Sequence, residues 1–170
     1  MSEISFRNDI MPLKNQLYRL ALRITLDNAE AEDIVQETLI KVWNQRDRWN
    51  EIENIPAFCF TICRNLSLDS IKRQANQHQS LDNTPVEHTD NAITPSEKAI
   101  QRDQVNLVRH IVDNLPEKQR SCIQLRDFEG KTYKDIAEIL NISTEQVKVN
   151  IFRARQTIKL RFQDLDDYGL

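Results

Sequence analysis

Apolar residues recur along most of the chain in steps of three and four, the spacing of an amphipathic helix. The pattern predicts an all-α fold with helices over about residues 4–26, 28–45, 56–75, 97–115, 117–128, 133–140 and 143–162. Helix start and stop residues agree with these bounds, since Asp27 or Asn28 can cap the second helix, Pro56 can open the third and Gly130 can end the fifth. The polar stretch 48–54 is predicted to be a loop.

Residues 76–96 break this periodicity. They contain two prolines, three acids and no Lys or Arg, a composition typical of a linker. An unstructured stretch of this length is uncommon inside one compact domain but natural between two. We therefore predict a three-helix domain over residues 1–75, a flexible linker over 76–96, a second helical domain over 97–163 and an acidic tail over 164–170.

Composition excludes several function classes. The only glycines are Gly130 and Gly169, too few for a Gly-rich phosphate loop or for hairpin-rich β structure. The three cysteines and three histidines lack the spacing of metal ligands, and no catalytic dyad is evident, so we expect neither an enzyme nor a cofactor. With no signal peptide and no apolar stretch near 18 residues, we expect a cytoplasmic protein without membrane insertion.

The strongest functional signal is a helix-turn-helix pattern over residues 132–155. Ala137 is a small residue where two helices would cross, and Asn141 tolerates the positive φ of the turn. Residues 131–163 carry seven basic and three acidic residues, a balance of +4, although the whole chain has a net charge of −3. Basic and amide side chains on the exposed face of the last helix suit a DNA major groove, although an ordinary helical hairpin would show the same apolar pattern.

Two sets of motifs then resemble one known family. Residues 115–120, 129–137 and 147–155 are similar to region 4 of the bacterial extracytoplasmic-function (ECF) sigma factors of the sigma-70 family. Residues 31–43 resemble region 2.2, and residues 56–73 resemble regions 2.3 and 2.4. The resemblance implies a subunit that binds core RNA polymerase and promoter DNA, with region 2 opening the −10 element and region 4 binding the −35 element.

The resemblance also implies where the polymerase docks. It assigns core polymerase binding to Asp33, Gln36 and Glu37. Residues 27–37 contain five acids and no base, which suits a basic partner surface. The same acids would also complement the dipole at a helix N-terminus.

The DNA contacts are expected on both domains. The candidates for the −10 element are Trp49, Arg64, Asn65, Lys72 and Arg73. The candidates for the −35 element are Arg126, Ser143, Lys148, Val149, Asn150, Phe152 and Arg153. The family commonly has Val-Lys/Arg-Ser-Arg where this chain has Val147-Lys148-Val149-Asn150, so the −35 sequence cannot be carried over from relatives.

The sequence leaves open whether the protein is a polymerase subunit and whether it has an anti-sigma partner. One alternative is a helix-turn-helix regulator that binds duplex DNA without being a polymerase subunit. A regulator of the response-regulator type would need a βα receiver domain, which the helical periodicity of residues 1–75 does not favour. Many members of the family are held inactive by an anti-sigma factor, which makes such a protein a candidate partner.

Overall fold

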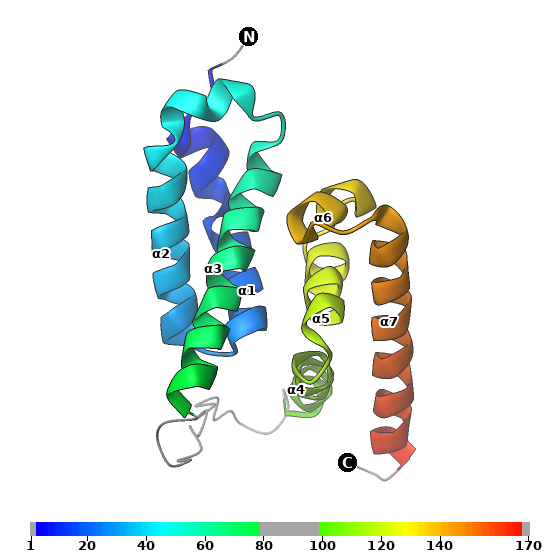
Figure 1. Cartoon of the computed structure of the whole chain (residues 1–170). Helices are drawn as coiled ribbons and strands as arrows, with labels where there is room; N and C mark the ends of the chain where they lie inside the picture. Colours follow the sequence, from blue (N-terminus) through cyan, green and yellow to red (C-terminus); the bar gives the residue numbers. More distant parts are fainter. Residues whose placement is uncertain (1–2, 79–98, 168–170) are drawn as a thin grey trace.

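The computed structural model describes residues 3–78 and 99–167, and its longer elements are all α-helices (Figure 1). The N-terminal bundle consists of α1 (Lys14–Thr25), α2 (Asn28–Asn44) and α3 (Ile55–His78). The C-terminal bundle consists of α4 (Ala99–Asp113), α5 (Glu117–Ile123), α6 (Tyr133–Leu140) and α7 (Thr144–Asp167). The predicted all-α architecture of two helical units is confirmed.

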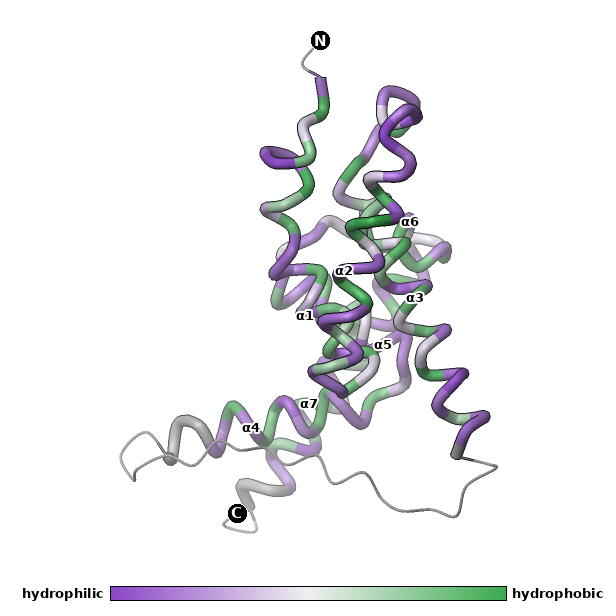
Figure 2. Tube along the Cα trace, turned by 90° about the vertical axis from the view of Figure 1, so that its left-hand side faces the viewer, coloured by the Kyte–Doolittle hydropathy of each residue, from purple (hydrophilic) through white to green (hydrophobic). Residues whose placement is uncertain are grey.

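The N-terminal bundle follows from its caps and its apolar faces. Leu26 reverses the chain after α1 with a φ of 59°, and the Asp27 carboxylate then accepts hydrogen bonds from the backbone amides of Ala29 and Glu30. Each helix has one buried face, so green and purple segments alternate along the tube in Figure 2. Among the described residues, no helix is both long enough and apolar enough to cross a membrane.

Several element bounds differ from the sequence prediction. The helix expected over residues 117–128 is divided into α5 and a π-helical turn (Gln124–Phe128). The first helix is divided, because a π-helical turn (Phe6–Ile10) and a 3₁₀ turn (Met11–Leu13) that contains Pro12 precede α1. The expected loop after α2 forms a 3₁₀ helix over Arg46–Glu51. α3 continues to His78, and α7 to Asp167, so α7 includes the first four residues of the expected tail. The rest of that tail, and linker residues 79–96, lie outside the described residues.

The C-terminal bundle contains the predicted helix-turn-helix. Thr132 caps α6 by accepting a hydrogen bond from the Asp135 amide at 3.1 Å. Asn141 adopts the left-handed conformation, with a φ of 54°, in the turn between α6 and α7. Val147 and Ile151 anchor the inner face of α7, at 0% and 2% exposure. The turn therefore forms without a glycine, as the sequence indicates.

The two bundles pack against each other in this structure. α1 and α3 contact α5 and α6, and the same helices lie beside one another in Figure 1. The interface between the bundles, called here the inter-bundle interface, therefore covers one side of α3.

Candidate nucleic-acid interface

The N-terminus of α7 is fixed by a reciprocal pair of hydrogen bonds. The Ser143 hydroxyl accepts from the Gln146 amide at 3.1 Å, and the Gln146 side-chain oxygen accepts from the Ser143 amide at 3.1 Å. This arrangement is a capping box, which satisfies two backbone donors that would otherwise have no partner. The Ser143 hydroxyl proton stays free to donate to a phosphate.

The exposed face of α7 carries most of the predicted −35 residues. Lys148, Val149, Phe152 and Arg153 are all exposed there. Asn150 is different, since it is half-buried and its side-chain amide donates to the Gln146 carbonyl at 2.8 Å. The helix therefore presents cationic and apolar side chains toward solvent, whereas the Asn150 amide, which was expected to contact the −35 element, is bound to the helix backbone.

Arg126 belongs to a cluster beside α7. Its guanidinium lies 4.5 Å from the centre of the Tyr133 ring and donates to the Lys131 carbonyl at 2.8 Å. The Lys148 ammonium lies 6.0 Å from the centre of the same ring. Tyr133 thus holds two cations at the start of α6, a positioning role that the sequence did not single out.

The predicted polymerase-docking residues share one face of α2. Asp33, Gln36 and Glu37 are exposed, and their spacing of three and four residues places them side by side. Ile40, at 59% exposure, follows one turn later, and Trp43 is 45% exposed near the end of the helix. The exposure of these two apolar residues was not predictable from the sequence, because their spacing also fits a core position.

The structure corrects the expectation that Trp49 offers a surface for DNA. Its side chain is 6% exposed, and its indole nitrogen donates to the Val42 carbonyl at 3.0 Å. The Trp49 ring stacks on Phe6 and meets Trp43 edge-on, with ring centres 6.5 Å and 6.1 Å away. Trp49 therefore packs in the core of the N-terminal bundle, and this burial holds the 3₁₀ helix after α2.

A pocket of about 670 Å³ opens between the end of α2, the 3₁₀ helix and α3. Asn65 and Leu66 line it from α3, and Lys41 and Arg48 line it from the other two elements. Lys72 and Arg73 are exposed further along α3. The structure thus brings one predicted −10 residue into a pocket and leaves two more on the same helix.

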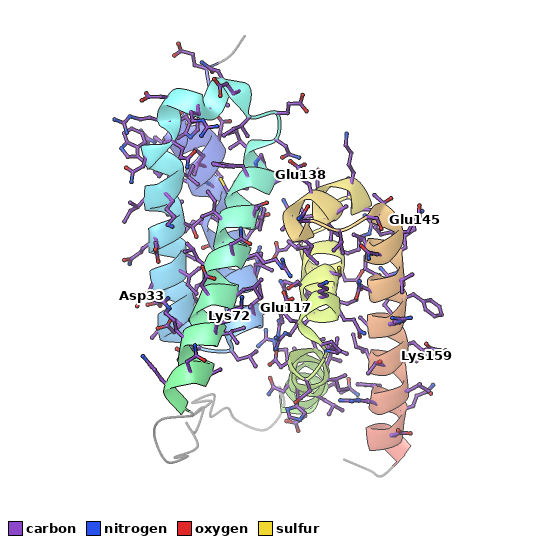
Figure 3. The ribbon with its side chains drawn as sticks, in the orientation of Figure 1. Asp33, Lys72, Glu117, Glu138, Glu145 and Lys159 are labelled. Atoms are coloured by element: carbon purple, nitrogen blue, oxygen red, sulfur yellow. The ribbon has the colours of Figure 1, made fainter. Side chains whose placement is uncertain are left out.

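Arg64 is buried in the inter-bundle interface. Its side chain is 8% exposed and donates two hydrogen bonds to the Glu117 carboxylate, at 3.1 Å and 2.9 Å. Glu117 lies on the side of α5 that faces α3 (Figure 3) and also accepts from the Ser121 hydroxyl at 2.7 Å. In this arrangement of the bundles, Arg64 is not available to DNA.

The rest of the inter-bundle interface follows the same charge pattern. Arg19 of α1 donates to Glu129 at 2.7 Å, and Arg23 donates to Asp113 at 2.8 Å. Nearer α6, Asn54 donates to Asp135 at 2.9 Å. In the three ion pairs the N-terminal bundle thus contributes the arginines and the C-terminal bundle the carboxylates. Lys131 of the C-terminal bundle adds a cation–π contact, 4.8 Å from the centre of the Phe60 ring.

The cysteines are core residues. Cys59, Cys63 and Cys122 are fully buried, and burial raises the pKa of each thiol to about 12. Thiols protonated to that pH are poor nucleophiles and poor ligands at neutral pH. Within the part of the chain that the structure describes, no group of three or more His, Cys, Asp or Glu could hold a metal ion.

Comparisons with known sequences identify both helical bundles. The family profile described as Sigma-70 region 2 matches residues 10–77, and the profile described as Sigma-70, region 4 matches residues 106–158. The RNA polymerase sigma-H factor of Pseudomonas aeruginosa is 28% identical over 167 residues, which cover 92% of this chain and 86% of the relative. The ECF RNA polymerase sigma factor SigL of Mycobacterium tuberculosis is 31% identical over 150 residues, which cover 88% of this chain and 84% of SigL.

Solved structures share the fold. The sigma factor RpoE, in its complex with the anti-sigma factor NepR from Bartonella quintana, superposes with a TM-score of 0.76 at 25% identity, covering 93% of this chain and 96% of RpoE. CnrH, in its complex with the cytosolic domain of CnrY, has a TM-score of 0.66 at 18% identity, covering 91% of this chain and 85% of CnrH. Because both sigma regions match in order and SigL is related over most of its length, the chain belongs to the ECF sigma factors of the sigma-70 family, non-catalytic subunits that direct transcription initiation by binding core RNA polymerase.

Proposed function

We propose that this sigma factor divides its work between two oppositely charged surfaces, the acidic face of α2 for core polymerase and the basic face of α7 for the −35 element. The observation that supports this division is that both faces are exposed on one chain. Other charged residues, such as Arg23 and Arg64, are paired with carboxylates in the inter-bundle interface. On α2, Asp33 and Glu37 attract a basic polymerase surface, and Ile40 and Trp43 add apolar contact area next to them.

The pocket beside Asn65 supports a role in opening the −10 element. Its amide side chains can hydrogen-bond the edge of a base, and Ile62 and Leu66 offer an apolar surface for the ring. We propose that a base of the melted strand enters it, with Asn65 at its edge and with Lys72 and Arg73 along the strand's phosphates.

Arg64 can join these contacts only after its pair with Glu117 breaks. We therefore propose that the described structure is a closed form, and that the two bundles separate when the protein binds polymerase. The separation also allows region 2 and region 4 to reach promoter elements that lie apart on DNA. The two ends of the linker at residues 76–96 are attached to the separating bundles.

The proposed contact at the −35 element is a major-groove contact of α7. Lys148 and Arg153 are exposed on α7, and the Tyr133 ring holds Arg126 near Lys148. Cationic side chains there suit phosphate and guanine edges. The proposed place of action is the cytoplasm, where polymerase and the chromosome are found.

An anti-sigma factor is a further proposed partner. The support is the likeness to RpoE over 93% of this chain in a complex with the anti-sigma factor NepR. We propose that such a protein would favour the closed form, because it could contact both bundles at once.

Promoter-specific run-off transcription with purified core polymerase tests the division of work. Wild-type protein should support a defined transcript, and the double variant Asp33→Lys with Glu37→Lys should lose core binding while keeping duplex −35 binding. Asp103→Lys on exposed α4 is the control, since it reverses a charge away from both surfaces. If the double variant binds core polymerase as tightly as wild type, the proposed docking face is wrong.

A further inference from the structure

Two large apolar side chains stand next to each other on the exposed face of α7. Val149 is 45% exposed and Phe152 is 66% exposed, although both residue types are usually buried. Residues three apart on a helix are neighbours, so the two form one surface, called here the Val149–Phe152 patch. The buried residues Val147 and Ile151 on the other side of α7 keep this patch turned outward.

The surroundings of the patch suit DNA. Lys148 precedes Val149 and Arg153 follows Phe152, and both basic side chains are exposed. Glu145 and Lys159, labelled in Figure 3, bracket the part of α7 that carries the patch. Basic side chains on both sides of an apolar patch complement a groove bordered by phosphates.

The amide side chains nearby are already engaged. Bidentate recognition of adenine in the major groove requires a free Asn or Gln amide. Asn150 donates to the Gln146 carbonyl at 2.8 Å, and the Gln146 side-chain oxygen accepts from the Ser143 amide at 3.1 Å. The free reading surface of α7 is therefore cationic and apolar rather than amide-rich.

We propose that the Val149–Phe152 patch recognises thymine in the −35 element through the 5-methyl group of the base. The proposal rests on the proposed −35 role of α7. Among the four bases, thymine alone presents an apolar group in the major groove, and Phe and other apolar side chains contact it there. 5-Methylcytosine carries the same methyl group and is a second source of the same chemistry.

The test uses the full-length protein bound to core polymerase. A duplex library randomised over the −35 region is first enriched by binding to this holoenzyme. Each thymine of the enriched sequence is then replaced singly by deoxyuridine, which pairs identically but lacks the methyl group. We expect deoxyuridine to raise the Kd about fourfold at one or two positions, the factor for burying a single methyl group.

Variants assign the effect to residues. Val149→Ser removes both side-chain methyl groups, and we expect it to abolish the deoxyuridine effect at one of those positions, with Phe152→Ala acting at a neighbouring one. Leu160→Ser is the matched control, since Leu160 is 55% exposed further along the same helix and should leave every deoxyuridine effect intact. At the position assigned to Val149, replacing thymine by cytosine should weaken binding, and 5-methylcytosine should recover about fourfold.

The possible results distinguish failure of the thymine-methyl proposal from failure of the proposed −35 role of α7. If the library is enriched but no thymine is sensitive to deoxyuridine, the methyl reading is wrong and the −35 role stands. Deoxyuridine effects that persist unchanged in both Val149→Ser and Phe152→Ala would also overturn it. If the holoenzyme enriches no −35 sequence at all, the proposed role of α7 fails together with the inference.

Discussion

The DNA-contact candidates of the two bundles differ in how exposed their side chains are. On α7, Lys148, Val149, Phe152 and Arg153 are exposed together on one helix face. In the N-terminal bundle, Asn65, Lys72 and Arg73 are exposed, but Trp49 packs in the core and Arg64 is paired across the inter-bundle interface.

This difference follows from what each surface must recognise. A duplex major groove has a fixed shape, so a rigid helix face can be formed in advance. The −10 strand becomes single only after melting, and a surface for it can remain partly covered until polymerase and DNA are bound. The closed form therefore hides part of the −10 surface and leaves the −35 surface open.

The largest expected effect separates the two tryptophans of the N-terminal bundle. Trp49→Ala should lower the free energy of unfolding by about 3–5 kcal/mol, because it leaves a cavity and removes the hydrogen bond to Val42. Trp43 is 45% exposed and touches Phe6 and Trp49 only at one edge of the cluster, so Trp43→Ala should cost less, about 1–2 kcal/mol. Urea unfolding measures both, and similar losses for the two variants would contradict the structural role of Trp49.

The second prediction opens the closed form. Glu117→Ala leaves Arg64 without its partner, which should disfavour the closed form by about 2 kcal/mol. Cys122 reports the change, because it lies close enough to Arg64 and Glu117 for both charges to act on its pKa. Burial is the main reason that the Cys122 pKa is raised, and it also shields the thiol from reagents. Opening should expose the thiol and speed its alkylation by iodoacetamide at pH 8, by more than the loss of the Glu117 charge alone would.

Two comparisons make the alkylation result specific. Cys63, which donates to the Leu17 carbonyl inside the N-terminal bundle, should stay unreactive in the variant. Lys118→Ala, an exposed neighbour on α5, should react like wild type. Equal acceleration of Cys63 and Cys122 would indicate general unfolding rather than separation of the bundles.

The third prediction concerns the exposed −35 face of α7. Arg153→Ala should weaken binding of the −35 duplex about tenfold, within the range for one lost bidentate contact. The loss should be the same in the Glu117→Ala background, since α7 is exposed in the closed form as well. Arg161→Ala, an exposed arginine two turns further along α7, is the control for charge alone. A loss that depends on the background would mean that closure also restricts α7.

Sequence reasoning succeeded where the signal was local. The cap at Asp27 and the turn at Asn141 were predictable because each depends on neighbouring residues. The pairing of Arg64 with Glu117 was not, since the partners are 53 residues apart and either could have been a solvated charge. The prediction for Trp49 was wrong for a related reason. Its burial depends on the distant Phe6 and on a 3₁₀ helix, and the polar residues around Trp49 had indicated a loop there.

The smallest expected effect tests whether the turn before α7 fixes the position of the exposed −35 face. Asn141 holds a φ of 54°, a conformation that glycine adopts freely and alanine adopts at a cost. Asn141→Ala should therefore lower the free energy of unfolding by about 1 kcal/mol, and Asn141→Gly should change it by only a few tenths. Circular dichroism during thermal unfolding separates the two variants, and both should bind the −35 duplex as wild type does at temperatures where they are folded. If Asn141→Gly weakens duplex binding while the fold is intact, the rigidity of this turn contributes to reading, and the −35 surface is less completely formed in advance than the exposure of α7 indicates.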